Sequence, residues 1–355
     1  MRNIPVEHAK VLKTKPADET KLGFGKIFTD HMLVMDYDPE RRWHDMRIVP
    51  YGDFSMDPAT AVYHYGQAIF EGMKAYPGKE GCLRLFRPRD NFLRMNVSAL
   101  RMGMPGLDVD QCLEGLKKLL DIERDWVPTN EGTSLYIRPT MIATDVGLGV
   151  RASESYRFFI IMSPSGAYYA SGLAPIGIYV EDELVRAVSG GIGYTKAAAN
   201  YAASLYAGML AKENGYAQVL WLDGVEKKYI EEVGSMNIMF AFGERIVTPM
   251  LNGSILEGIT RGSILRLARD MGYMVEEKRV AMQEIYDGAR DGSLTEAFGT
   301  GTAAVVSPVG SLCWRGEVVT VGDGGIGGVT RRLYDTLTGI QRGTVKDPYG
   351  WTMEL

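Results

Sequence analysis

GGIGYTKAAANYAASLYA, which runs from Gly190 to Ala207, carries more structural information than any other stretch of this 355-residue chain. Its glycine-rich beginning predicts a tight turn, and the small residues after Lys196 predict a helix that ends at Gly215, a typical C-cap residue. Lys196 therefore stands at the start of a helix, where the helix dipole disfavours an ammonium. The spacing alone suits either a nucleophilic amine or, as the default, an ordinary solvated lysine. The stretch is not a P-loop, because Thr195 stands where glycine must precede the lysine.

Alternating strand-like and helical patterns precede this stretch and predict an α+β half. The expected strands cover 26–37, 61–70, 70–88, 133–143 and 156–164, with a polar turn after the first, and the expected helices cover 91–102 and 110–126. In the first helix, Leu93, Val97 and Leu100 share one face. Small residues and glycines at 165–174 then indicate a connector.

The second half begins with a strand near Pro175 and is richer in strands. We expect further strands at 217–222, 229–233, 237–242, 245–250, 273–280 and 303–308, and helices at 197–214, 258–272 and 329–343. These patterns predict a mixed α/β and α+β chain of two domains. The predicted boundaries are a smaller N-terminal domain at 1–165, an interdomain loop at 166–177, and a larger domain with the lysine at 178–355.

The composition excludes several classes of protein. The chain is 46% hydrophobic and 23% charged with a net charge of −5, so it predicts a globular protein without a basic face for nucleic acid. No apolar run is long enough to predict a membrane span, and the N-terminus is unlike a leader peptide. The three cysteines are widely spaced and all four histidines precede Tyr65, which argues against a zinc site and favours a reducing cytoplasm.

The ordered motifs resemble those of the branched-chain-amino-acid aminotransferases, which are class IV, fold type IV pyridoxal-phosphate enzymes related in fold to D-amino-acid aminotransferase. The resemblance spans nearly the whole chain. It is carried by GGIGYTKAAANYAASLYA, HYGQAIFEGMKAY, RLFRPRDNFLRM, GTSLYIRPTMIA, QVLWLDG, YIEEVGSMNIMF, LNGSILEGITR and FGTGTAAVVSPV.

The resemblance implies a transaminase that moves the amino group of L-leucine, L-isoleucine or L-valine to 2-oxoglutarate through pyridoxal 5'-phosphate. It implies that Lys196 forms the internal aldimine and then moves the proton from substrate Cα to cofactor, through quinonoid and ketimine stages. Glu232 would keep the ring nitrogen protonated, and Tyr201 would hydrogen-bond the phenolic oxygen. Alternation along the strand places Glu231 on the opposite face from Glu232, towards solvent.

The resemblance also implies contacts to the rest of the cofactor. The first turn of the helix that begins near Ile259 offers backbone N–H groups to a phosphate, and an arginine fork adds donors. The full set implied is Lys196, Arg94, Tyr201, Glu232, Ser235, Leu256, Ile259, Thr260 and Thr302. Ser235 replaces the threonine that other members carry, and the resemblance implies no metal.

One substrate pocket must accept both a branched apolar side chain and that of glutamate. Aromatic residues that match the family's pocket would line it, and Arg138 would bind the distal carboxylate of glutamate or orient Tyr65. The turn at Thr302 and Ala303 would bind the α-carboxylate. The implied set is Phe24, Tyr65, Phe70, Tyr136, Arg138, Tyr168, Thr302 and Ala303.

The resemblance further implies a homodimer, because fold type IV sites borrow pocket residues from the neighbouring subunit. It implies a cytoplasmic enzyme of branched-chain amino acid biosynthesis or degradation. Two alternatives stay open at this point. One is another fold type IV activity, such as D-amino-acid transamination or aminodeoxychorismate lysis, and the other is a catalytically silent binding protein.

Overall fold

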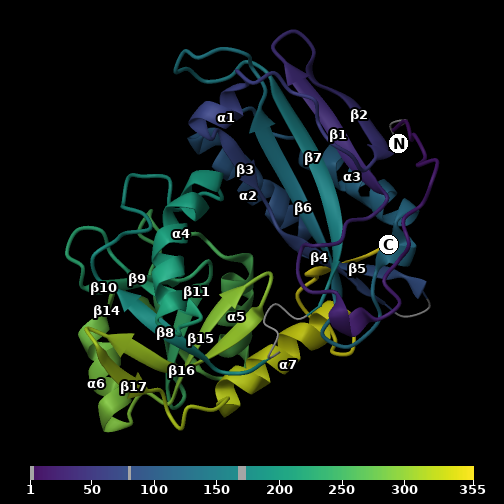
Figure 1. Cartoon of the computed structure of the whole chain (residues 1–355). Helices are drawn as coiled ribbons and strands as arrows, with labels where there is room; N and C mark the ends of the chain where they lie inside the picture. The colour runs from purple at the N-terminus through teal and green to yellow at the C-terminus, as the bar shows by residue number, and fades with distance from the viewer. Residues whose placement is uncertain (1–3, 79–80, 167–172) are drawn as a thin grey trace. The chain divides into compact units, whose positions relative to one another are not determined.

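A computed structural model describes residues 4–78, 81–166 and 173–355 (Figure 1). The chain divides into unit 1, which comprises Met1–Ala170, Thr195–Ala199 and Ile340–Leu355, and unit 2, which comprises Ser171–Tyr194 and Asn200–Gly339. The lysine segment and the C-terminal segment therefore belong with the N-terminal residues, unlike in the predicted division. Both segments pair with strands of unit 1. Residues 167–172 of the predicted connector lie outside the described residues.

Unit 1 is built on an eight-stranded antiparallel sheet in the order β18-β5-β4-β6-β7-β1-β2, with β3 paired to β6. Its strands are β1 (His31–Asp38), β2 (Arg42–Pro50), β3 (Ala68–Phe70), β4 (Met73–Pro77), β5 (Leu83–Phe86), β6 (Ser134–Ala143), β7 (Tyr156–Ser165) and β18 (Thr352–Glu354). Its helices are α1 (Ala61–Tyr65), α2 (Pro88–Arg101), α3 (Val109–Ile122) and the 3-10 turns at Glu19–Lys21 and Arg124–Trp126.

Helices α2 and α3 pack on each other and against the unit 1 sheet (Figure 1). The side chain of Asp108 caps α3 by accepting a hydrogen bond from the Gln111 N–H. Gly115 lets this helix lie close to β1, because a Cβ at that position would overlap the Leu33 side chain. The buried apolar residues between helices and sheet form the core that supports β3 and β6.

Two sequence predictions in unit 1 are wrong. Residues 61–70 are not one strand: α1 occupies the first half and ends at Gly66, whose left-handed conformation separates it from β3. Strand β2 lies where the sequence predicts only a polar turn, because charged side chains interrupt its apolar alternation.

The apolar residues singled out in α2 share a face, but this face is exposed. Leu93, Val97 and Leu100 are 48%, 50% and 82% exposed, whereas Phe92 and Met95 are buried. Apolar residues occur on both sides of this helix, so periodicity alone could not show which side packs on the sheet.

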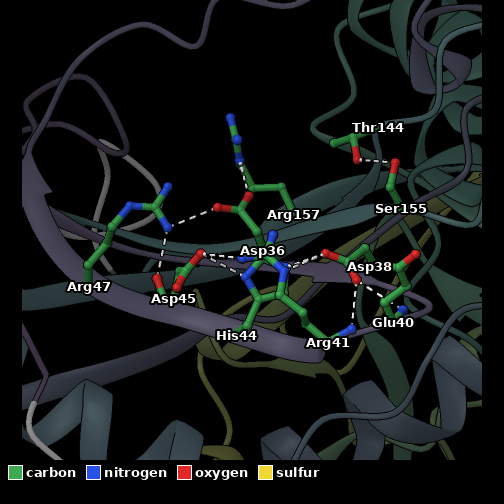
Figure 2. A network of polar contacts seen from close by, with 10 residues as sticks. All are labelled: Asp36, Asp38, Glu40, Arg41, His44, Asp45, Arg47, Thr144, Ser155 and Arg157. Atoms are coloured by element: carbon green, nitrogen blue, oxygen red, sulfur yellow. Dashed lines mark hydrogen bonds and ion pairs between the residues drawn. The ribbon is translucent and has the colours of Figure 1, made fainter.

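Charged side chains link β1, β2 and β7 on the surface of unit 1 (Figure 2). Asp36 accepts hydrogen bonds from Arg47 on β2 and Arg157 on β7, each at 2.8 Å. The His44 ring lies 2.9 Å from a carboxylate oxygen of Asp38, across the hairpin. These contacts hold the hairpin to its neighbouring strand.

Unit 2 contains a ten-stranded mixed sheet in the order β13-β12-β11-β15-β16-β8-β9-β10-β14, with β17 paired to β16. Its strands are β8 (Ile176–Glu181), β9 (Gln218–Leu222), β10 (Tyr229–Val233), β11 (Asn237–Phe242), β12 (Arg245–Pro249), β13 (Met274–Lys278), β14 (Val280–Ala281), β15 (Glu296–Gly301), β16 (Val305–Trp314) and β17 (Glu317–Thr320). Its helices are α5 (Ile259–Asp270) and α6 (Met282–Asp291), together with most of α4 (Ala198–Glu213) and α7 (Gly328–Arg342).

Helices α4, α5 and α7 of the structure follow the predicted patterns. In α5, Ile264, Leu265, Leu267 and Ala268 are buried as its periodicity predicted, and Gly272 follows the helix in a left-handed conformation. Helix α6 and strand β15 are missing from the predicted elements, because each is short and carries polar residues or glycine.

Candidate active site

Lys196 lies two residues before α4, in a segment that pairs with strand β3 of unit 1. The Phe70 N–H donates to the Lys196 carbonyl at 3.1 Å, and Ile69 pairs with Ala197 in an antiparallel bridge. The Lys196 N–H donates to the hydroxyl of Ser98 on α2 at 2.9 Å. The lysine backbone is therefore fixed by both a strand and a helix.

Predicted pocket residues of unit 1 form a chain of contacts that begins at the Lys196 side chain. The Lys196 Nζ lies 5.1 Å from the Phe70 ring centroid, and the Arg138 guanidinium lies 4.7 Å from the same centroid. Arg138 also donates to the Tyr136 hydroxyl at 3.3 Å, and Phe24 packs edge-on against Tyr136 with centroids 4.8 Å apart. We call Phe24, Phe70, Tyr136, Arg138 and Lys196 the lysine cluster.

Arg94 is held by a carboxylate that the sequence reasoning missed. It lies on α2 one turn before Ser98, and its side chain is 11% exposed. Glu71, which is fully buried, accepts from Arg94 Nε and Nη2 at 2.8 Å each. A bidentate ion pair fixes the plane of a guanidinium, so Glu71 orients Arg94.

Lys74 is a buried amine in this part of unit 1. It lies on β4 directly opposite Tyr136 on β6. Burial lowers the pKa of Lys74 to about 7, and the positive charge of Arg342 contributes to the lowering. A lysine with this pKa loses its charge near neutral pH.

Of the predicted aromatic pocket residues, Tyr65 does not lie in the lysine cluster. Tyr65, the last residue of α1, is 42% exposed and donates its hydroxyl hydrogen bond to the Leu148 carbonyl. Tyr168 lies outside the described residues.

Unit 2 surrounds Glu232 with hydrogen-bond donors. Glu232 lies on β10 and is 3% exposed. Its carboxylate lies 2.5 Å from the Arg186 guanidinium and accepts from the Asn237 amide at 3.2 Å and the Leu256 N–H at 3.3 Å. We call these residues, Glu232, Arg186, Asn237 and Leu256, the acid cluster.

The prediction that Glu231 points to solvent is wrong, because its exposure is also only 3%. The pairing between β9 and β10 shifts register between Ile230 and Glu232, which breaks the alternation of side chains at Glu231. Glu231 instead accepts hydrogen bonds from the Ser254 hydroxyl and from the Asn252 amide at 3.0 Å.

The first turn of α5 begins after Gly258, as the sequence predicted. Gly258 is the N-cap and has no side chain to bind the N–H groups of the first turn, which begins with Ile259 and the buried Thr260. Such a turn favours an anion. Thr302 and Ala303 lie in the turn between β15 and β16.

The remaining predicted cofactor residues also lie in unit 2. Ser235 is exposed in the two-residue turn Gly234–Ser235, which joins β10 to β11. Tyr201 lies half-buried in the first turns of α4, and its carbonyl accepts from the Ser204 hydroxyl at 2.7 Å.

Several residues of the site were missed by sequence reasoning. Glu71 lies within the F-E-G motif that carries the resemblance, so its buried charge could have been noticed. Ser98, Arg186 and Ser254 give no local signal, because each is identified only by a partner far along the chain.

The described residues show two further negative results. No group of three or more His, Cys, Asp or Glu side chains among them is arranged to hold a metal ion. None of the described helices has the length and apolar character needed to span a membrane.

Comparisons with known proteins agree with this fold. The family model for amino-transferase class IV matches residues 68–312. Branched-chain-amino-acid aminotransferase 2 of Bacillus subtilis (strain 168) is 55% identical, covering 100% of this chain and 97% of that protein. The Escherichia coli branched-chain amino acid aminotransferase structure is 29% identical with a TM-score of 0.77, covering 91% of this chain and 98% of that chain.

A third similar protein has a ligand in its structure. The T.th. branched-chain amino acid aminotransferase with pyridoxamine 5'-phosphate is 26% identical with a TM-score of 0.74, covering 90% of this chain and 97% of that chain. These matches confirm the predicted fold type.

Proposed function

The chain belongs to the class IV amino-transferases, and from this premise we propose that it is a branched-chain-amino-acid transaminase that uses pyridoxal 5'-phosphate. Its donors would be L-leucine, L-isoleucine and L-valine, and its acceptor 2-oxoglutarate. The observation that carries the proposal is the lysine cluster, in which Lys196 and Arg138 face one aromatic ring. The relative that is 55% identical over the whole chain is itself a branched-chain-amino-acid aminotransferase.

The residues present fit this cofactor. Pyridoxal 5'-phosphate supplies an aldehyde and an electron-withdrawing ring that acidifies the substrate Cα–H. Arg94, already oriented by Glu71, provides guanidinium donors for its phosphate. The first turn of α5 at Ile259 and Thr260 would provide backbone N–H groups for a phosphate, with Thr302 adding a hydroxyl.

The buried acid and the lysine have separate tasks. Glu232 would accept a hydrogen bond from the protonated ring nitrogen, and Tyr201 would donate one to the phenolic oxygen. Ser235 and Leu256 complete the cofactor contacts. Lys196 Nζ would take the proton from the substrate Cα and deliver it to the C4′ carbon of the cofactor, which requires the amine to stay close to the reacting atoms.

The lysine cluster provides for two unlike substrates. Phe24, Phe70 and Tyr136 present apolar surfaces to a branched side chain. Arg138 provides a cation for the distal carboxylate of glutamate, and its buried Nε has no hydrogen-bond partner among the described residues. The turn at Thr302 and Ala303 binds the α-carboxylate.

A homodimer is the proposed assembly. Unit 1 exposes an apolar stripe on α2 at Leu93, Val97 and Leu100, and exposed apolar surface of this kind marks interfaces. Tyr65 and Leu148 are exposed on neighbouring segments, and Tyr65 would serve the partner's pocket. Unit 2 exposes a second stripe on α4, at Leu205, Tyr206 and Met209.

We place the enzyme in the cytoplasm, in the biosynthesis or degradation of branched-chain amino acids. Its cysteines, Cys82, Cys112 and Cys313, form no disulfide, which suits a reducing compartment.

The proposal is tested with purified protein and three substrates. L-Leucine with 2-oxoglutarate should be turned over, whereas D-alanine and aminodeoxychorismate should not. Borohydride should fix a pyridoxyl group on the peptide that contains Lys196. Turnover of D-alanine without L-leucine, or label on another peptide, would overturn the assignment.

A further inference from the structure

We propose that Arg186 is a positioning residue of the cofactor site: it fixes Glu232 and ties it to the segments that lead to Lys196 and to α5. The inference rests on the proposed function, because it concerns the carboxylate assigned to the ring nitrogen. Arg186 belongs to none of the sequence motifs that carry the family resemblance.

The guanidinium of Arg186 contacts three separate segments of unit 2. Its Nη2 lies 2.5 Å from a carboxylate oxygen of Glu232. The same nitrogen donates to the Ser254 carbonyl at 2.7 Å and lies 3.3 Å from the Gly193 carbonyl. The Arg186 side chain is 7% exposed and that of Glu232 is 4% exposed, so water scarcely competes for these contacts.

Each carbonyl lies close in sequence to a proposed cofactor contact. Gly193 is three residues before Lys196, and Ser254 is five residues before Ile259, where α5 begins. The two segments also touch directly, because a Cβ on Gly193 would overlap the Ser254 carbonyl oxygen. The Arg186 guanidinium therefore links three parts of the proposed site. These are the segment before Lys196, the segment before α5, and the carboxylate of Glu232.

A second layer of hydrogen bonds holds the Ser254 end of this bridge. The Ser254 hydroxyl donates to the buried carboxylate of Glu231, and the Ser254 N–H donates to the Asn252 side-chain oxygen at 3.0 Å. Asn252 in turn donates to Glu231 at 3.0 Å. Ser254 is thus fixed on its backbone and its side chain, which makes its carbonyl a rigid acceptor for Arg186.

The chemistry requires such a fixed acid. A carboxylate stabilises a protonated ring nitrogen only when one oxygen stays within hydrogen-bond distance, and a buried side chain stays there when other groups hold it. The ion pair with Arg186 holds one carboxylate oxygen of Glu232, while the Asn237 side chain and the Leu256 N–H donate hydrogen bonds to the other oxygen. Lysine could replace the charge of Arg186 but not its planar set of donors.

The test compares Arg186→Met and Arg186→Lys with the wild-type holoenzyme. We expect Arg186→Met to raise the cofactor dissociation constant by about 10- to 100-fold, the range for a lost contact to a charged group. The rise in melting temperature on adding pyridoxal 5'-phosphate to apo-protein should shrink accordingly. Arg186→Lys should lie between Arg186→Met and the wild type, and KM for L-leucine should change little compared with kcat.

Arg157→Met is the control, because Arg157 pairs with Asp36 on the surface of unit 1 and touches neither cluster. It should leave cofactor affinity unchanged. A purely structural Arg186 would lower the melting temperatures of apo- and holo-protein equally and leave cofactor affinity intact, which would overturn the inference. If Arg186→Met does not fold, Arg186→Lys tests the inference by the same two measurements, the cofactor dissociation constant and the melting temperatures of apo- and holo-protein. A wild-type protein that binds no cofactor at Lys196 would instead contradict the proposed function.

Discussion

Glu71 binds the guanidinium of Arg94 at two points, with Nε 2.8 Å from Oε1 and Nη2 2.8 Å from Oε2. Glu71 directly follows Phe70, which contacts Lys196, and directly precedes Gly72, which lies against Tyr136. Three consecutive residues at the end of β3 thus shape three parts of the proposed site. This arrangement makes the F-E-G motif the most informative target for substitution in unit 1.

Glu71→Gln should weaken cofactor retention without unfolding the protein. The amide keeps the shape of the side chain but loses the charge that orients Arg94, so we expect the cofactor dissociation constant to rise about tenfold. Equilibrium dialysis measures the cofactor dissociation constant of the variant and of the wild type. Asp90→Asn is the matched control, because Asp90 pairs with Arg87 on the surface of the same helix and should have no effect. Equal affinities of the Glu71→Gln and wild-type proteins would contradict the role of Glu71.

Gly72→Ala should impair both substrate binding and stability. A Cβ at this position would overlap the Tyr136 hydroxyl, so the ring must move away from Arg138 and the pocket must change shape. We expect KM for L-leucine to rise several-fold, with a loss of about 1–3 kcal/mol in stability. Gly52→Ala, where a Cβ would meet open space, serves as the control. An unchanged KM would show that Tyr136 does not line the substrate pocket.

Lys74 should make stability depend on pH above neutrality. Burial lowers its pKa from 10.5 to about 7 in the folded protein, so between these values the unfolded chain holds a proton that the folded chain lacks. Stability therefore rises with pH across this window, by at most roughly 1.4 kcal/mol per pH unit. Below pH 7 both states are protonated and the dependence ends.

Urea unfolding of the wild type and of Lys74→Met at pH 7, 8 and 9 measures this effect. The stability of the wild type relative to the variant should increase at each step. Parallel pH dependences of the two proteins would rule out a titrating Lys74.

Glu232→Gln should slow proton transfer while leaving the cofactor bound. A neutral amide cannot stabilise a protonated ring nitrogen as a carboxylate does, so we expect kcat to fall on the order of 10²-fold. Single-turnover rates with L-leucine and its α-deuterated form should show a larger isotope effect in the variant. Glu244→Gln, at an exposed position of the same unit, should behave as the wild type. Unchanged turnover in Glu232→Gln would remove the acid from the mechanism.

Leu100→Glu should convert the proposed dimer into monomers. Leu100 is the most exposed residue of the α2 stripe, at 82%, and a carboxylate there would be desolvated in any interface that covers the stripe. Light scattering measures the molecular mass. Val11→Glu is the control, because Val11 is 84% exposed but belongs to the N-terminal segment and not to α2. A dimeric Leu100→Glu protein would place the interface elsewhere.

Local features of the site followed from the sequence. The glycine-rich turn before Lys196, the helix after it and the N-cap at Gly258 are set by short-range backbone preferences. Residue periodicity likewise identified the buried apolar residues Ile264, Leu265, Leu267 and Ala268 of α5. The resemblance to a family supplied the roles of the site residues, which no local pattern contains.

The tertiary structure decided what depends on distant partners. Glu231 is buried because a register shift against β9 turns it inward, and strand alternation cannot reveal such a shift. Arg186 meets Glu232, and Glu71 meets Arg94, only because the fold brings their segments together. Backbone conformational preferences act over a few residues, so they can be predicted from the sequence alone. The pairing of buried charges and the choice of exposed helix face are settled by packing between elements far apart in sequence.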